Sequence, residues 1–151
     1  MSSPKFSLQN ILEIRHGKVD LLEIELGKLL AIHQETQDLL ASLREYQESL
    51  LNQLSAAQTG EIDLVNLNLL RLNALQVNRH IDIVTLELKK QSRAIEAKRI
   101  ELIQAKQSEE TLKTLKRNRH EVYAAEQIHI EAQAQDDIYI ARAFSNHQQG
   151  A

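Results

Sequence analysis

The feature that most constrains this chain is an apolar repeat that advances in alternating steps of four and three residues. Eleven of its fifteen positions are apolar. A period of 3.5 residues is typical of a left-handed coiled coil, because a stripe with this period stays on the side of a helix that faces a partner. The positions are Leu8, Leu12, Arg15, Val19, Leu22, Leu26, Leu29, His33, Thr36, Leu40, Leu43, Gln47, Leu50, Leu54 and Ala57.

A second repeat of the same period follows after a break. Gly60 lies in the break, where glycine can end a helix in a left-handed conformation, and Thr59 or Asp63 can cap the helix that follows. A continuous helix through Gly60 is the alternative, because one glycine is tolerated within a helix. Nine of the eleven positions of the second repeat are apolar: Leu70, Ala74, Val77, Ile81, Val84, Leu88, Gln91, Ile95, Lys98, Leu102 and Ala105.

Together the repeats predict an all-α fold, a long antiparallel two-helix coiled-coil hairpin whose second helix is longer than the first. A pairing that is symmetric around the break places Ile81 near Leu40. The first helix then ends opposite about Leu115, and the second helix continues without a partner. The expected single domain (1–151) has helix 1 at about 4–57, a turn at about 58–62, helix 2 at about 63–145 and a disordered tail at 146–151.

The composition agrees with a long helical protein. Aromatic residues make up 3% of the chain, and four glycines and one proline are too few for the turns of a sheet or a compact fold. The lack of cysteine excludes disulfides and thiolate metal sites. Neither a signal-peptide pattern nor an apolar run of about 20 residues is present. We therefore expect a cytoplasmic protein without direct membrane insertion.

Residue patterns that would indicate catalysis are incomplete. His120 and Glu121 begin a zinc-protease motif, but Ala124 stands where the second histidine is needed. No glycine-rich phosphate loop or convergent pair of carboxylates is readable, and a two-helix hairpin offers no enclosed pocket. The sequence predicts a protein that is not an enzyme and has no catalytic residues, metal site or cofactor.

Charge is distributed unevenly along the chain. Residues 89–119 carry ten basic and four acidic groups, and residues 120–151 carry one basic and five acidic groups. Three interpretations remain open for the basic zone: a solvated face, a docking strip for an acidic protein, and a nucleic-acid or lipid surface. Nucleic acid is disfavoured, because Tyr123 is the only nearby aromatic residue. Four basic residues share one stripe by their spacing: Arg99, Lys106, Lys113 and Arg117.

Two segments carry a family resemblance. The opening contains Phe6, Leu8, Gln9, Ile11, Leu12 and Arg15. The second helix contains Arg99, Leu102, Ala105, Glu110, Leu112, Leu115, Lys116 and Tyr123. In these positions the chain resembles the FliJ family, the coiled-coil hairpins of the flagellar type III export apparatus. It departs from the family pattern Glu-Gln-Lys-x-x-Asp-Glu at "EAQAQDD", where the lysine is missing.

The resemblance implies a non-enzymatic adaptor or stalk that docks in a hexameric export ATPase, stimulates it and helps to escort substrates as a chaperone. It also implies contact with the membrane export gate near the turn. The residues that it assigns to the ring are Arg93, Arg99, Lys113, Lys116, Arg117, Arg119, Tyr123 and Ile130. Those that it assigns to the turn end are Tyr46, Leu69, Asn73, Gln76 and His80.

Two other functions remain open at this point. The altered "EAQAQDD" segment is compatible with a FliJ-like regulator outside flagella, bound to a metabolic enzyme complex such as a chelatase that contains an AAA motor. A structural scaffold is the other possibility. The sequence leaves monomer and homodimer open, since a coiled-coil stripe is satisfied by the chain's own second helix or by another copy.

Overall fold

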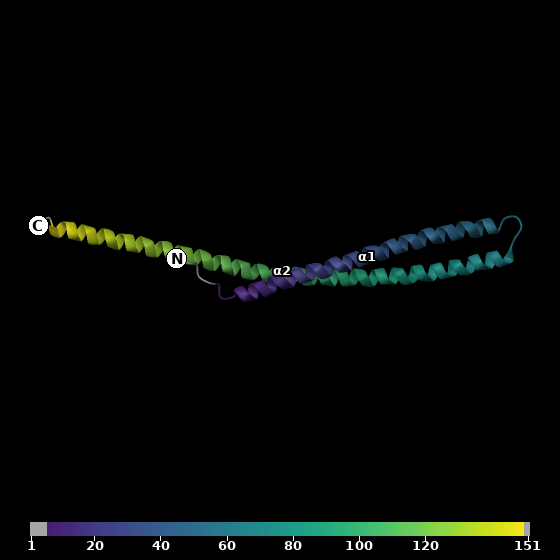
Figure 1. Ribbon diagram of the computed structural model, residues 1–151, viewed down its shortest axis with the longest axis horizontal. Coiled ribbons are helices and arrows are strands. Elements are labelled where there is room, and N and C mark those ends of the chain that lie inside the picture. Colours follow the sequence, from purple (N-terminus) through teal and green to yellow (C-terminus); the bar gives the residue numbers. More distant parts are fainter. Residues whose placement is uncertain (1–5, 150–151) are drawn as a thin grey trace. The chain divides into compact units, whose positions relative to one another are not determined.

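The computed structural model describes residues 6–149 and contains two helices, α1 (Gln9–Ala57) and α2 (Leu64–Gln149) (Figure 1). The described residues include no strand. The prediction of an all-α hairpin with a longer second helix is confirmed. The described chain divides into two compact units, residues 20–104 and residues 6–19 with 105–149.

In the unit of residues 20–104, α1 and α2 pack antiparallel along the predicted stripes. Leu50, Leu70 and Val77 form a buried cluster, and Leu54 and Ile81 pack against it. Every predicted stripe position in this unit is buried or half-buried. The two apolar stripes therefore form the core, because burial of their side chains is what holds the two helices together.

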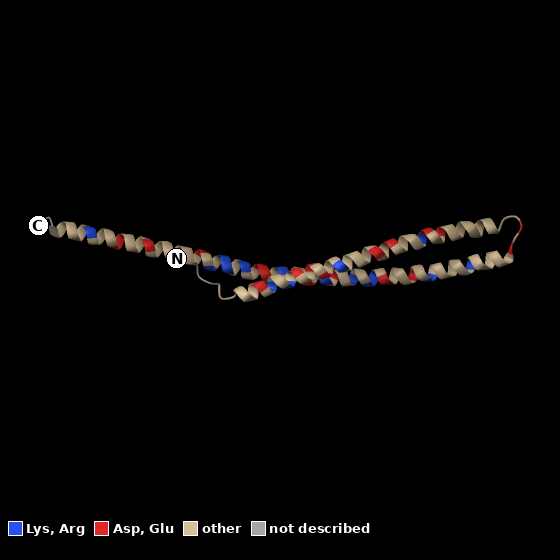
Figure 2. Cartoon of the chain, in the orientation of Figure 1, with Lys and Arg blue, Asp and Glu red and all other residues tan. Residues whose placement is uncertain are grey.

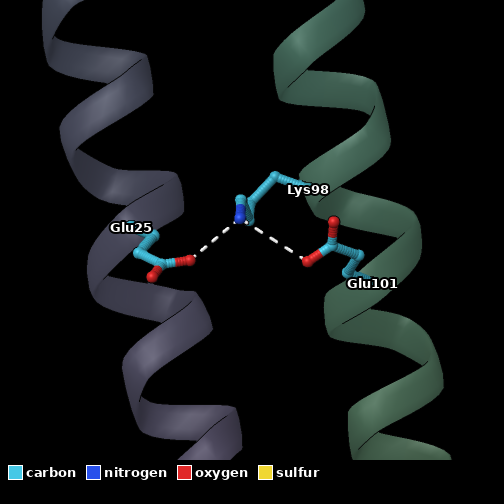
Figure 3. A network of polar contacts seen from close by, with 3 residues as sticks. All are labelled: Glu25, Lys98 and Glu101. Carbon is cyan, nitrogen blue, oxygen red and sulfur yellow. Dashed lines mark hydrogen bonds and ion pairs between the residues drawn. The ribbon is translucent and has the colours of Figure 1, made fainter.

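Polar side chains interrupt this apolar interface. The Gln91 amide donates to Thr36 Oγ1 over 2.9 Å, and its Oε1 lies 3.1 Å from His33 Nδ1. Lys98 Nζ lies 2.9 Å from a carboxylate oxygen of Glu25, the contact that most raises the pKa of Lys98 (Figure 3). Polar groups at interface positions find partners across the interface, so each one ties α1 to a particular place on α2.

The register differs from the one that symmetry around Gly60 predicts. Gln47 donates to Asn78 Oδ1 over 2.6 Å, whereas the symmetric pairing puts residue 74 opposite Gln47. The difference is about one helical turn. The apolar repeat alone does not determine this offset.

The connection between the helices contains a tight turn. Thr59 Oγ1 donates to the carbonyl of Ala56, and Gly60 has a positive φ of 78°. Asp63 caps α2, since its Oδ1 accepts from the N–H groups of Val65 and Asn66. A continuous helix through Gly60 is therefore wrong.

We expect replacement of Gly60 by alanine to destabilise the hairpin by about 1–2 kcal/mol, because an L-residue pays a steric cost in the left-handed region. No atom lies within 4 Å of the Cβ that alanine would add, so the loss of stability comes from the backbone conformation alone and not from a clash. The control is Gly17→Ala inside α1, where a Cβ also meets no atom within 4 Å and helix propensity favours alanine by about 1 kcal/mol. Urea unfolding should move in opposite directions for the two variants, and parallel shifts would contradict this account.

In the other unit, the first residues of the described chain contact α2 between Ser108 and Arg119. Leu12, Ala105 and Leu112 are buried, and Tyr123 and Gln127 are half-buried. Beyond this point every side chain from residue 128 to residue 148 is exposed.

The two ends of the predicted helices differ from their expected places. α1 begins at Gln9, after a turn at Ser7 and Leu8, and the expected start at residue 4 lies outside the described residues. The disordered tail was expected from residue 146, but α2 continues through Gln149.

Candidate partner-binding surface

The basic residues of α2 concentrate in its middle, and its final part carries few (Figure 2). Within the unit of residues 6–19 and 105–149, several of them are engaged by the chain itself. Lys116 Nζ donates to Gln9 Oε1 over 2.9 Å, and Arg119 Nη1 donates to Ser7 Oγ over the same distance. The Arg119 guanidinium also lies 5.4 Å from the centre of the Phe6 ring, a cation–π distance.

These contacts give Lys116 and Arg119 a structural role that the sequence did not indicate. Both cations hold the segment that leads into α1, so they position its first residues. Arg117 is exposed and bonds locally to Thr114 Oγ1 over 3.3 Å, and this short-range contact leaves it at the surface. Arg117 differs from Lys116 and Arg119, because its hydrogen bond stays within α2.

A buried carboxylate, that of Glu109, lies about two turns before Lys116 on α2. Glu109 is 6% exposed, and its Oε1 lies 2.7 Å from His16 Nδ1 and 3.0 Å from Lys113 Nζ. The hydrogen bond to His16, and next that to Lys113, hold the pKa of Glu109 below its usual range. The hydrogen bond between Lys113 and Glu109 in turn raises the pKa of Lys113.

Sequence reasoning missed Glu109, although a signal was present. The steps of four and three lead from Ala105 to Glu109 and then to Leu112, so Glu109 occupies an interface position of α2. Beside it, Arg15 Nη1 donates to the carbonyl of Ser108 over 2.8 Å. An acidic residue at such a position calls for a basic partner on the facing helix, and His16 provides it.

This arrangement predicts a pH-dependent contribution to stability. Because the pKa of Glu109 is lower in the folded chain than its ordinary value of 4.5, its stabilising effect is complete above that value and is lost as pH falls through the folded-state pKa. Wild type should therefore lose more stability between pH 6 and pH 3 than Glu109→Gln does. Urea midpoints measured over this range test the prediction, with exposed Glu110→Gln as control. Parallel pH profiles for wild type and Glu109→Gln would contradict it.

The last part of α2 presents exposed apolar side chains. Ile130 and Phe144 continue the 3.5-residue spacing of the interface, as does Ile140, and Phe144 is 63% exposed. Ile128 and Tyr139 lie on the other side of the same helix by their spacing. We call residues 128–148 the detached segment.

The residues that resemblance assigned to the ring are split between the two units. Lys113, Lys116, Arg117, Arg119, Tyr123 and Ile130 belong to the unit of residues 6–19 and 105–149. Arg93 and Arg99 belong to the unit of residues 20–104, where both are exposed. Arg93 borders a shallow depression beside Ile83 and Leu86.

The turn-end residues all lie in the unit of residues 20–104. Leu69, Asn73, Gln76 and His80 follow steps of four, three and four, so they share one stripe of α2. Tyr46 and Leu69 are exposed to about half of their surface, at 48% and 56%. In the stripe, Leu69, Gln76 and His80 are exposed and Asn73 is half-buried, so most of its surface is open to another protein.

A family comparison adds to this geometry. The family model described as flagellar FliJ protein matches residues 4–149. The chain belongs to the FliJ family. Searches of curated proteins and of solved structures gave no match.

Membership of the FliJ family indicates a stalk-like role in flagellar export that is exerted through protein–protein interactions. The FliJ family is a non-catalytic one. Within residues 6–149, no group of three metal-ligating side chains gathers. The described part of this FliJ-family chain also has no helix with the length and apolarity to span a membrane.

Proposed function

We propose that the chain is a cytoplasmic stalk that docks its detached segment in the ring of a type III export ATPase and raises ATP turnover. The observation that carries this proposal is the continuous exposure of α2 from residue 128 to residue 148. A single helix without tertiary packing is marginal in water, so such a segment gains most of its stability from a partner.

The chemistry of the segment favours a protein partner. Ile130, Ile140 and Phe144 provide apolar anchors at coiled-coil spacing, the kind of residue that fills pockets at the centre of interfaces. Acidic and amide side chains surround them, including Asp136 and Asp137. A ring whose central opening has apolar and basic walls would complement this surface.

Other residues would extend the contact. Arg117 and Arg93 remain proposed ring contacts, together with Arg99, Lys113, Lys116, Arg119, Tyr123 and Ile130. Because Lys116 and Arg119 already bind Gln9 and Ser7, the ring would meet these two cations together with the start of α1. The stripe of Leu69, Asn73, Gln76 and His80, with Tyr46, is the proposed contact for the membrane export gate, at which the chain would help to escort substrates.

The deciding experiment measures ATP turnover of a hexameric export ATPase with the full chain and with a chain that ends at Gln127. This truncation keeps every half-buried residue of its unit and removes only exposed side chains and the terminal residues. We expect the full chain to stimulate turnover and the truncated chain to leave it at the basal rate. Equal stimulation by both chains would overturn the proposal.

Point variants make the test sharper. Ile130→Ser with Phe144→Ser removes two anchors from the stripe that continues the interface spacing. Ile128→Ser with Tyr139→Ser removes comparable apolar surface from the other side. The first pair should reduce stimulation strongly and the second should not. Stimulation of a different ring-shaped motor, with no effect on the export ATPase, would favour the regulator outside flagella.

A further inference from the structure

A second row of residues with steps of three and four runs along α1 beside the interface. It includes apolar residues that α2 leaves open: Ile14 is 71% exposed, Leu21 is 55% exposed and Ile32 is 50% exposed. α1 is one uninterrupted helix from Gln9 to Ala57, so this spacing keeps the row on one face. We call this row the flank stripe, and its residues are Ile14, Lys18, Leu21, Glu25, Lys28, Ile32, Glu35 and Leu39. Nothing in the ring or gate proposals uses it.

The flank stripe lies on the opposite side of α1 from a groove of about 440 Å³ between the helices. His33 and Gln37 of α1 line that groove, together with Thr85 and Ser92 of α2. Gln37 follows the interface residue Thr36, whereas Ile32 precedes the interface residue His33, so Gln37 and Ile32 flank the interface on its two sides. The flank stripe therefore faces away from the groove.

We propose that a second copy of this chain covers the flank stripe by antiparallel pairing of α1 with α1. When the twofold axis lies between Leu26 and Gly27, Glu25, which also binds Lys98 of its own chain, faces Lys28 of the second copy. In the same register, Lys18 faces Glu35 of the second copy. Each pair occurs twice, because the interface of a twofold dimer is made by the same patch on both copies.

The apolar residues match in the same register. Leu21 faces Ile32 of the second copy, and Ile14 faces Leu39. The row therefore reads as a palindrome in which apolar residues meet apolar residues and each charge meets its opposite. Such complementarity is the signature of an isologous interface.

Other arrangements lose this match. A shift of one heptad in one direction places Lys18 opposite Lys28, and a shift in the other direction places Glu25 opposite Glu35. A parallel pairing in register places each charge opposite itself. Like charges that face each other at coiled-coil positions disfavour pairing, so the register centred between Leu26 and Gly27 is favoured over these three arrangements.

Charge reversal tests this register with the full chain. In sedimentation equilibrium from about 5 to about 500 μM, a range that brackets micromolar affinity, wild type should rise from the monomer mass of 17.3 kDa towards twice that value. Lys18→Glu places two glutamates together at both ends of the interface, and Glu35→Lys places two lysines together. Each variant should weaken dimerisation about tenfold or more, since two attractive pairs become repulsive.

The mixture of the two variants gives the sharpest outcome. The glutamate introduced at position 18 of one copy then faces the lysine introduced at position 35 of the other. An equimolar mixture should therefore form a heterodimer at concentrations at which each variant alone is monomeric. Arg44→Glu mixed with Glu48→Lys is the matched control, because both residues are exposed on α1 outside the flank stripe. Circular dichroism of each variant confirms that the helices persist.

Two results would overturn the proposal. A wild-type chain that stays at the monomer mass throughout would leave the flank stripe to a helix of a different protein. A dimer that neither Lys18→Glu nor Glu35→Lys weakens would place the contact elsewhere on the chain.

Discussion

Replacing Leu50 by alanine should lower the stability of the hairpin by about 2–4 kcal/mol. Leu50 is 2% exposed and forms the buried cluster with Leu70 and Val77. The loss combines the transfer of a large apolar side chain to water with the cavity left between two helices that cannot fully close around it. We expect a clear shift of the urea midpoint followed by circular dichroism.

The neighbouring Leu51 provides the control. It is 56% exposed, and its replacement by alanine removes the same atoms from the same helix. Because leucine and alanine have similar helix propensities, Leu51→Ala should change stability by about 0.5 kcal/mol or less. If both variants had the same urea midpoint, the Leu50 cluster could not be the core of its unit.

The second large effect concerns the polar layer of His33, Thr36 and Gln91. Gln91→Leu alone removes the bonds that Gln91 makes to His33 and Thr36 and should cost about 1 kcal/mol. The double variant His33→Leu with Gln91→Leu instead places two leucines at facing interface positions. It should exceed wild type in stability by about 1–3 kcal/mol, since buried apolar surface replaces the hydrogen bonds of Gln91 to His33 and Thr36 and that of Gln37 to His33, and replacing both partners of a polar contact by apolar groups is nearly neutral or stabilising.

Loss of Gln91 does not leave the Thr36 hydroxyl without a hydrogen bond, so the change in stability can be assigned to His33 and Gln91. This hydroxyl donates to the carbonyl of Ile32 over 2.9 Å, so it keeps a partner when Gln91 is lost. The double variant should also pair less selectively, because a polar layer restricts the register and the number of strands. A broader distribution of masses at high concentration would show this loss. A double variant less stable than Gln91→Leu would contradict the account.

The fold was largely readable from the sequence because one physical rule dominates it. Leucine, isoleucine and valine recur at 3.5 residues, and positions such as Leu22, Leu40 and Val84 are buried as that rule predicts. The break at Gly60 was readable for a different reason, since few residues other than glycine accept a positive φ.

The helix register and the polar contacts were harder to predict from the sequence. A repeat of similar apolar residues can slide by a turn at little cost, so it did not reveal that Gln47 meets Asn78. The uneven charge of residues 89–119 gave no sign that Glu109, one of the four acidic groups there, is buried against His16. Composition and spacing identify a charge, whereas its partner depends on residues that lie far away in the sequence.

The candidate site shows the same limit. Lys116 and Arg119 were expected to face a partner, and the structure engages both with residues at the start of the chain, Gln9 and Ser7. The exposure of Ile130 and Phe144 agrees with the expectation that the second helix continues beyond its partner. Which protein binds there is a property of that protein's surface, which this sequence does not contain.

The separation along the chain of the bonded residues has a consequence for folding. Gln47 and Asn78 are 31 residues apart, whereas Ser7 and Arg119 are 112 apart. Since the entropy lost on closing a loop grows with its length, contacts near the turn should form first and those of Ser7 last. The contacts of Ser7, which form last, should also open first in native-state hydrogen exchange. Phe6 and Ser7 would then leave Arg119 while the Leu50 cluster stays closed, so a partner could reach this cation without unfolding the hairpin.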